Sequence, residues 1–151
     1  MIVACGFDHA GVPLRARVLA EVEGAGHTVL DLGTDAAEPP IDYPEKALAV
    51  GQAVVSGRAR RGIIVCGSGA GVSVAACKIR GVRAATIHDT YTAHQGVEHD
   101  DVNVLCLGGR VIGIEVAAEI VRAFLAAQLS HEERHVRRRA EVDEIERTGG
   151  A

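Results

Sequence analysis

A cysteine followed by a glycine-rich segment is the part of this sequence best suited to chemistry. Cys66 ends an apolar, β-branched run, and Gly67, Gly69 and Gly71 follow it at every second position. Such a turn between a strand and a helix leaves backbone N–H groups unpaired and directed at one spot, where an anion can bind. The same dipoles favour a thiolate over a thiol. A sulfur base beside an oxyanion site is suited to removing a proton from the carbon next to a carbonyl group.

The elements around this segment are expected to place it at one edge of a parallel sheet. Residues 63–65 predict a strand buried on both faces, and the apolar positions from Val72 to Ile79, Val74 among them, have the spacing of a helix that packs on the sheet. Other strands are predicted over 2–7, 28–32, 82–87 and 102–107. Other helices are predicted over about 13–24, 43–56, 90–99 and 113–128, the last with Val116, Ile120 and Phe124 buried.

The uninterrupted alternation of strands and helices predicts an α/β fold. We expect a three-layer αβα sandwich with a five-stranded, parallel, Rossmann-like sheet and right-handed crossovers. The glycine-bearing loops after the first, third and fifth strands then meet at the carboxyl edge of the sheet, where folds of this class place their sites. An extra C-terminal helix is expected within 128–148, where residues 130–133 have the pattern of a capping box. This helix is too polar for the core, so we expect it to reach toward a neighbouring subunit.

The composition limits the size and the class of the protein. A chain of 151 residues, 48% of them hydrophobic, is expected to form a single domain, and with no Trp, two Tyr and two Phe its core must consist of Val, Ile, Leu and Ala. No segment approaches the ~20 apolar residues of a membrane span, and no signal peptide is recognised. Four cysteines without a C-x-x-C pair indicate reduced thiols in the cytoplasm. A net charge of -4 argues against nucleic acid as a partner.

Five short motifs occur in order along nearly the whole chain. They are GFDHAG at 6–11, DYP at 42–44, CGSGAGVS at 66–73 with ACK at 76–78, His99 followed by GGRVIG at 108–113, and Arg134-His135 with Arg138. In this order they resemble the family of B-type ribose-5-phosphate isomerases and galactose-6-phosphate isomerases. The resemblance implies an aldose–ketose isomerisation of a sugar phosphate through a cis-enediolate, without a metal or another cofactor.

The resemblance also implies roles for individual residues. Cys66 resembles the base that moves a proton between the first two carbons, and Ser68 the group that shuttles a proton between the two substrate oxygens. Asp8 and His99 resemble the pair that opens the sugar ring. The other residues resemble those that bind substrate: the N–H groups of Gly67, Gly69, Ala70 and Gly71 for the enediolate, Tyr43 for the sugar, and His9, Arg110, Arg134 and Arg138 for a phosphate shared between the subunits of a homodimer or homotetramer.

The sequence differs from the family pattern at residues 96–100. Many ribose-5-phosphate members have Ser-Arg-x-His-Asn there, whereas this chain has GVEHD, so that Asp100 replaces an asparagine of the substrate-binding segment. Asn can donate a hydrogen bond to a sugar oxygen, whereas an ionised Asp only accepts one, and its charge opposes an enediolate nearby. Ribose 5-phosphate and ribulose 5-phosphate are the expected substrates, with tetrose and hexose phosphates as alternatives.

Structural roles are an alternative for several of these residues. A buried packing thiol is compatible with Cys66, and it is the interpretation that we prefer for Cys5, Cys77 and Cys106. The two site histidines, Tyr43 and the arginines of the final helix are also compatible with ordinary polar surface positions.

Three other functions fit parts of the sequence. The glycine-rich segment resembles a dinucleotide-binding loop, but Val72 stands where the third glycine is needed. A sugar-phosphate sensor that binds without turnover is a second possibility, and Asp100 is the residue that would indicate it. A metal hydrolase would have to use five residues whose spacing matches no pair of ligands one helical turn apart: His88, Asp89, His94, His99 and Asp101.

Overall fold

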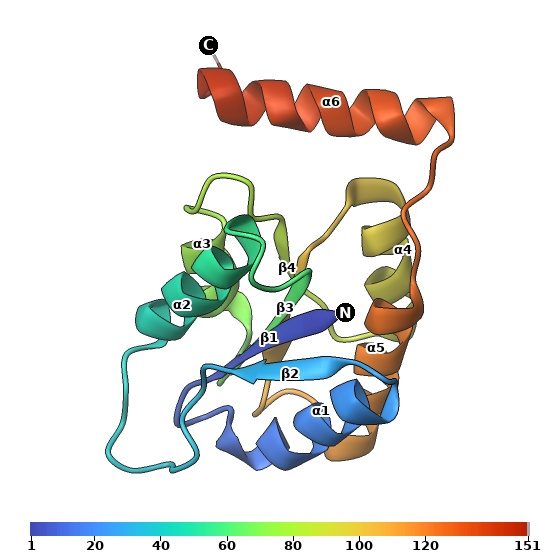
Figure 1. Ribbon diagram of the computed structural model, residues 1–151. Helices are drawn as coiled ribbons and strands as arrows, with labels where there is room; N and C mark the ends of the chain where they lie inside the picture. The colour runs from blue at the N-terminus through green and yellow to red at the C-terminus, as the bar shows by residue number, and fades with distance from the viewer. Residues whose placement is uncertain (151) are drawn as a thin grey trace.

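Alternating apolar strands and helices build a five-stranded parallel sheet that is covered on both faces (Figure 1). The computed structural model describes residues 1–150. The elements follow the chain in the order β1 (Ile2–Phe7), α1 (Val12–Gly24), β2 (Thr28–Asp31), α2 (Tyr43–Val55), β3 (Arg61–Cys66), α3 (Ala70–Ala76), β4 (Ala84–Thr86), α4 (Thr90–Asp100), β5 (Val104–Gly108), α5 (Ile114–Ala126) and α6 (Glu133–Thr148).

The strand order is β2-β1-β3-β5-β4, and every neighbouring pair is parallel. The predicted α/β fold with five parallel strands and an extra C-terminal helix is therefore confirmed. The three glycine-bearing loops follow β1, β3 and β5, which are adjacent in the sheet. In the register, Val65 lies opposite both Phe7 and Leu107, so these strands end level with one another. The three loops consequently meet at the carboxyl edge.

Two hydrophobic layers hold the sheet between its helices. On one face α1, α4 and α5 pack on odd-numbered strand residues such as Ile63 and Leu105, and on the other α2 and α3 pack on even-numbered residues such as Ile64 (Figure 1). Both sides of the central strands are thus apolar, because parallel strands are shielded from water on each face. Burial raises the pKa of the Cys5 thiol to about 12 and also raises the pKa of Cys106. Both cysteines are packing residues, as expected.

Some sequence predictions are wrong at the surface of these layers. Val74 and Val116 are exposed, because the short α3 contacts the sheet through Val72 and Ala76, and the buried stripe of α5 starts at Ala117. Cys77 is also exposed, contrary to the packing role expected for it.

The fourth and fifth strands are shorter at their starts than predicted. β4 and β5 begin at residues 84 and 104 rather than 82 and 102. The side chain of Asn103 explains part of this difference, because it accepts a hydrogen bond from the Arg83 N–H and donates one to the Gly81 carbonyl. Val102 bonds back to Gly96 of α4. These residues therefore form a connection rather than strand ladder.

The predicted capping box at the start of the last helix is wrong. α6 begins at Glu133 with Glu132 as its N-cap, and no side chain caps it. Ser130 instead donates its N–H to the carbonyl of Glu98, and its hydroxyl accepts the N–H of Glu132. Ser130 therefore holds the linker between α5 and α6, residues 127–132, against α4.

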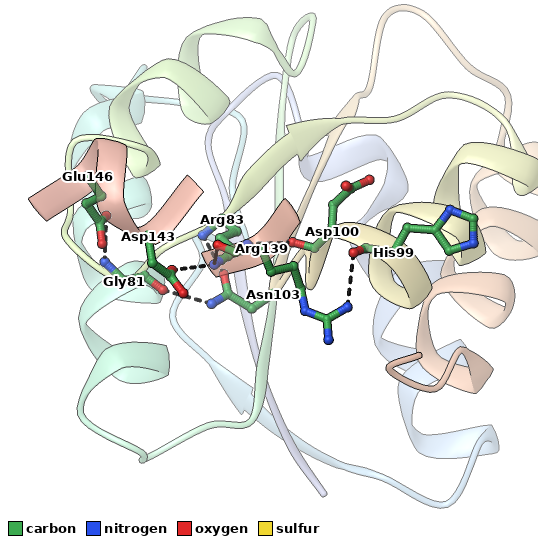
Figure 2. Close-up of polar contacts among 8 residues, drawn as sticks. All are labelled: Gly81, Arg83, His99, Asp100, Asn103, Arg139, Asp143 and Glu146. Atoms are coloured by element: carbon green, nitrogen blue, oxygen red, sulfur yellow. Dashed lines mark hydrogen bonds and ion pairs between the residues drawn. The ribbon is translucent and has the colours of Figure 1, made fainter. Parts of the chain in front are cut away.

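α6 lies outside the three layers and runs across one end of the molecule (Figure 1). Polar contacts hold it there: Asp143 forms an ion pair with Arg83, and Glu146 accepts the N–H of Gly81 at 2.9 Å (Figure 2). Whether α6 also reaches a neighbouring subunit stays a prediction. Within residues 1–150, no helix is both long enough and apolar enough to cross a membrane.

Candidate active site

Cys66 is the last residue of β3 and lies at the centre of the carboxyl edge. Its side chain is buried, and its Sγ accepts a hydrogen bond from the N–H of Gly69 at 3.1 Å. The hydroxyl of Ser68 in the same loop accepts the N–H of Ala70 at 3.3 Å and is exposed. A backbone N–H directed at sulfur stabilises negative charge there. The loop therefore has the arrangement expected for a thiolate beside an anion site.

The loop keeps this shape because side chains do not fit at two of its positions. Gly69 has a φ of +82°, and a Cβ there would lie 2.9 Å from Cγ2 of Thr86 and 3.1 Å from the carbonyl carbon of Leu107. A Cβ on Gly71 would lie 2.9 Å from the ring of Tyr43. Glycine at these positions lets β5 and the Tyr43 ring approach the backbone. Tyr43 is thereby placed beside the loop, and its contact with a sugar stays a prediction.

The loop after β5 holds the cysteine loop from the side. The N–H of Gly109 donates to the carbonyl of Cys66 at 2.7 Å, and the N–H of Arg110 donates to the carbonyl of Gly67 at 3.0 Å. Cδ of Arg110 lies 3.6 Å from the position that a Cβ on Gly67 would take. Arg110 therefore reaches the same edge as Cys66, as predicted.

Two further residues hold these loops, and sequence reasoning did not assign them this role. Thr86 donates its hydroxyl to the carbonyl of Gly69 at 3.0 Å, and Nε2 of His88 lies 3.0 Å from the N–H of Gly108 and accepts from it. Both are polar residues at the carboxyl end of β4, beside the loop of β5. That position was the available signal, but it becomes informative only when the strand order is known.

Asp8 and His9 follow β1 at the same edge. Asp8 is buried, and its Oδ1 accepts the N–H groups of Ala10 at 2.8 Å and Gly11 at 2.9 Å. Nδ1 of His9 lies 3.3 Å from backbone atoms of Ile41. The first group of predicted residues is thus gathered at one edge: Asp8, His9, Tyr43, the loop 66–71 and Arg110.

The other predicted residues lie at the opposite edge of the sheet. Because α4 runs antiparallel to the strands, its last turn returns to their starting ends, and the carbonyl of Asp100 accepts a hydrogen bond from Arg83 just before β4. The eleven residues of α4 span about 16 Å. His99 and Asp100 are therefore separated from Cys66 within one chain.

α6 adds the two predicted arginines to this second group. Arg138 and Asp100 both line a cavity of about 290 Å³ between α6 and β4, which none of the residues 66–71 lines. Arg134 forms an exposed ion pair with Glu132 at 2.9 Å. Figure 2 shows the end of α4 beside α6, with Arg139 bonded to the carbonyl of His99. A single chain therefore contains two half-sites rather than the complete predicted site.

The residues considered for a metal hydrolase have other partners. Besides the contact of His88 with β5, Asp89 caps α4 by accepting the N–H of Thr92 at 2.7 Å, and this bond lowers the pKa of Asp89. His94 lies 3.3 Å from a carboxylate oxygen of Glu98. In residues 1–150, no three His, Cys, Asp or Glu side chains form a group that could hold a metal ion.

Comparisons with known proteins agree with this geometry. The profile of the Ribose/Galactose Isomerase family matches residues 3–142. Ribose-5-phosphate isomerase B of Escherichia coli is 42% identical over 83% of this chain and 84% of its own length. D-erythrulose-4-phosphate isomerase of Pectobacterium atrosepticum is 39% identical over 83% of each. The structure of ribose-5-phosphate isomerase B from Clostridium thermocellum superposes with a TM-score of 0.93 at 40% identity, covering 99% of both chains.

A glycine substitution tests whether close packing determines the shape of the cysteine loop. Gly69→Ala combines a positive φ with overlap onto Thr86 and Leu107, and we expect it to lower the free energy of unfolding by about 2–4 kcal/mol. The matched control is Gly57→Ala, which has a φ of +77° but no atom within 4 Å of the new Cβ. It should cost only about 1 kcal/mol. Urea denaturation measures both, and equal costs would show that packing does not constrain the loop.

Proposed function

Because the chain belongs to the ribose/galactose isomerase family and is a sugar-phosphate isomerase, we propose that it interconverts ribose 5-phosphate and ribulose 5-phosphate through a cis-enediolate. The hydrogen bond from Gly69 to the sulfur of Cys66 is the observation that carries the proposal. This bond joins the thiol of Cys66, at the carboxyl edge, to the glycine loop. An isomerase needs a base and an oxyanion site within reach of the same two carbons.

The proposed proton transfers use Cys66 and Ser68. The Cys66 thiolate removes the proton from C2 of the open-chain aldose, and the electron pair forms the C1–C2 double bond while negative charge moves to O1. The resulting thiol returns the proton to C1. In the same sequence the proton of the O2 hydroxyl passes to O1 through the hydroxyl of Ser68, which leaves a carbonyl at C2. The N–H groups of Gly67 to Gly71 stabilise the enediolate; one such donor is typically worth about 100- to 1000-fold in rate.

Ring opening and phosphate binding need the second half-site. In the proposal Asp8 accepts the proton of the O1 hydroxyl while His99 gives one to the ring oxygen. His9 and Arg110 hold the phosphate from the carboxyl edge, and Arg134 and Arg138 hold it from α6. Since a single chain keeps these groups apart, we propose that two copies form a homodimer, alone or within a tetramer, and that each site combines the carboxyl edge of one with His99, Asp100 and α6 of the other.

A tetrose phosphate is the second candidate substrate. The relatives described above are named for ribose 5-phosphate and for D-erythrulose 4-phosphate at nearly equal identity. A panel of tetrose, pentose and hexose phosphates, compared by kcat/KM, selects between the candidates. A kcat/KM for the pentose phosphate that is lower than that for the tetrose or the hexose phosphate would contradict the proposal.

Removing the thiol should stop the chemistry without disturbing binding. We expect Cys66→Ala to reduce kcat by at least about 1000-fold, because no other group in the loop can take the C2 proton. Exchange of the substrate's C2 hydrogen with solvent should fall equally. Cys77→Ala, which changes an exposed thiol, is the matched control and should retain activity. Substantial exchange in Cys66→Ala would contradict the thiol base, and no exchange in the unaltered protein would indicate a non-catalytic sensor.

Mixed oligomers test whether the site is shared. Cys66→Ala and His99→Ala should each be nearly inactive alone. If one chain supplies Cys66 and the other His99, a mixture unfolded and refolded together should regain about a quarter of the wild-type activity, because half of the dimers are mixed and each has one intact site. The regained activity per chain is measured as a function of the mixing ratio of the two variants. Recovery that does not exceed the sum of the separate variants would show that each site lies within one chain.

The charge at position 100 should influence substrate preference. We expect Asp100→Asn to raise kcat/KM for ribose 5-phosphate by about tenfold, since an amide can donate to a sugar oxygen and carries no charge that opposes the enediolate. The tetrose phosphate should gain less. Asp101→Asn, one residue later and outside the cavity with Arg138, controls for a general loss of negative charge. Unchanged ratios between the sugars would remove position 100 from substrate selection.

A further inference from the structure

His135 is a buried titratable group to which the proposed mechanism gives no role. Among residues 1–150 it and Asp8 are the buried polar or charged side chains, and Asp8 already has a place in the proposed site. The neighbours of His135 along α6, such as Val136 and Arg137, are exposed. The helix therefore buries one imidazole, while the side chains that follow it in the sequence lie in water. Burial of a polar ring has a cost unless its contacts compensate.

The contacts of His135 are directed at His99. The two imidazole rings stack with centroids 3.9 Å apart and planes inclined by 24°. Nδ1 of His135 lies 2.8 Å from the hydroxyl of Ser130, and the N–H of Ser130 donates to α4 at Glu98. On the other side, Nδ1 of His99 lies 2.8 Å from Nε2 of Gln95. The His99 ring is thus fixed by a hydrogen bond at one nitrogen and by a stacked ring on one face.

The charges around His135 disfavour its protonation. The groups that face His135 are His99 on α4, Glu132 on the linker, and Arg134 and Arg138 on α6; the guanidinium of Arg139 bonds the carbonyls of His99 and Ser130. Burial lowers the pKa of His135 first of all. His99, Arg134 and Arg138 lower it further, and Glu132 alone opposes them. Two positive rings at this separation would repel each other, whereas one cation on a neutral aromatic face is attractive.

We propose that His135 is a positioning residue for His99, whose ring it orients by stacking against one face. The proposal rests on the proposed role of His99 in ring opening. His99 is only half-buried and can present its Nε2 to a substrate, while His135 is enclosed and stays neutral. A neutral His135 places no positive charge against the His99 ring, which the proposed mechanism uses as the acid for the ring oxygen.

Histidine titration by NMR tests whether His135 stays neutral, without any measurement of activity. Signals are assigned with His99→Gln and His135→Gln, and the unaltered protein is titrated from pH 8 to pH 5. We expect the His135 signals to show no inflection near the ordinary value of about 6.5. A His135 that titrates first, or with an ordinary midpoint, would overturn the proposal.

Kinetics with conservative and non-conservative variants separate positioning from mere stability. His135→Phe keeps an aromatic face and should retain most of the activity and its pH profile. His135→Ala removes the face and should lower kcat/KM about 10- to 100-fold, with a changed pH profile. Val136→Ala, at the next and exposed position, is the matched control. If His135→Phe is as defective as His135→Ala, or if His135→Ala keeps the wild-type profile, the positioning role is wrong.

Stability against pH gives a third readout. A histidine whose pKa is lowered by folding takes up a proton in the unfolded chain first, so stability is full above about pH 6.5 and falls as the pH drops through the lower folded value. The free energy of unfolding should therefore decrease from pH 7.5 to pH 5, and less so in His135→Phe. Equal slopes of the free energy of unfolding against pH in the unaltered protein and in His135→Phe would contradict a neutral His135. These outcomes are independent of Cys66→Ala, whose failure to stop isomerisation would overturn the proposed function alone.

Discussion

The close approach of the β5 backbone to the cysteine loop is the constraint on which the rest of the site depends. Gly109 and Arg110 donate their N–H groups to the carbonyls of Cys66 and Gly67, so these carbonyls face the loop that follows β5. The N–H of Gly69 is then left to face Sγ. A Cβ on Gly108 would lie 2.8 Å from the backbone of Ser68, so the two loops can approach this closely only where β5 carries no side chain. The orientation of the Gly69 N–H toward the sulfur therefore follows from the packing of the two loop backbones.

The direction of α4 is the second constraint. A helix that follows a parallel strand must return to the starting edge of the sheet, so residues at its two ends serve opposite edges. Asp89 at its start is next to the loops of β4 and β5, while His99 at its end contacts α6. The residues that the proposed mechanism assigns to the two ends of one substrate are thus separated within the chain. Association of two copies is what the proposed mechanism needs to bring them together, and it couples activity to assembly.

These two constraints explain what the sequence could predict. The cysteine loop depends on local features, a β-branched run followed by glycines, and its position at the carboxyl edge was predicted. The roles of Thr86 and His88 depend on β4 lying beside β5, which no local pattern reveals. Val116 fits a helical stripe as well as Ala117 does, and only the sheet decides which is buried. His135 lies in a polar, arginine-rich run, and its burial arises from a contact with α4 that is distant in sequence.

The end of α4 shows how an acidic residue at position 100 is accommodated by the fold. The last carbonyls of a helix have no partners within it and carry partial negative charge, so a carboxylate at this point is unfavourable. Here the carbonyls of His99 and Asp100 accept hydrogen bonds from Arg139 at 3.1 Å and Arg83 at 3.0 Å (Figure 2). Two guanidinium groups therefore compensate the partial negative charge of the helix end. Because Arg83 also forms an ion pair with Asp143 and Arg139 lies on α6, the same two arginines hold the end of α4 and place α6 beside it. Residue 100 and Arg138 therefore line one cavity, and a substitution at residue 100 changes the surroundings of Arg138.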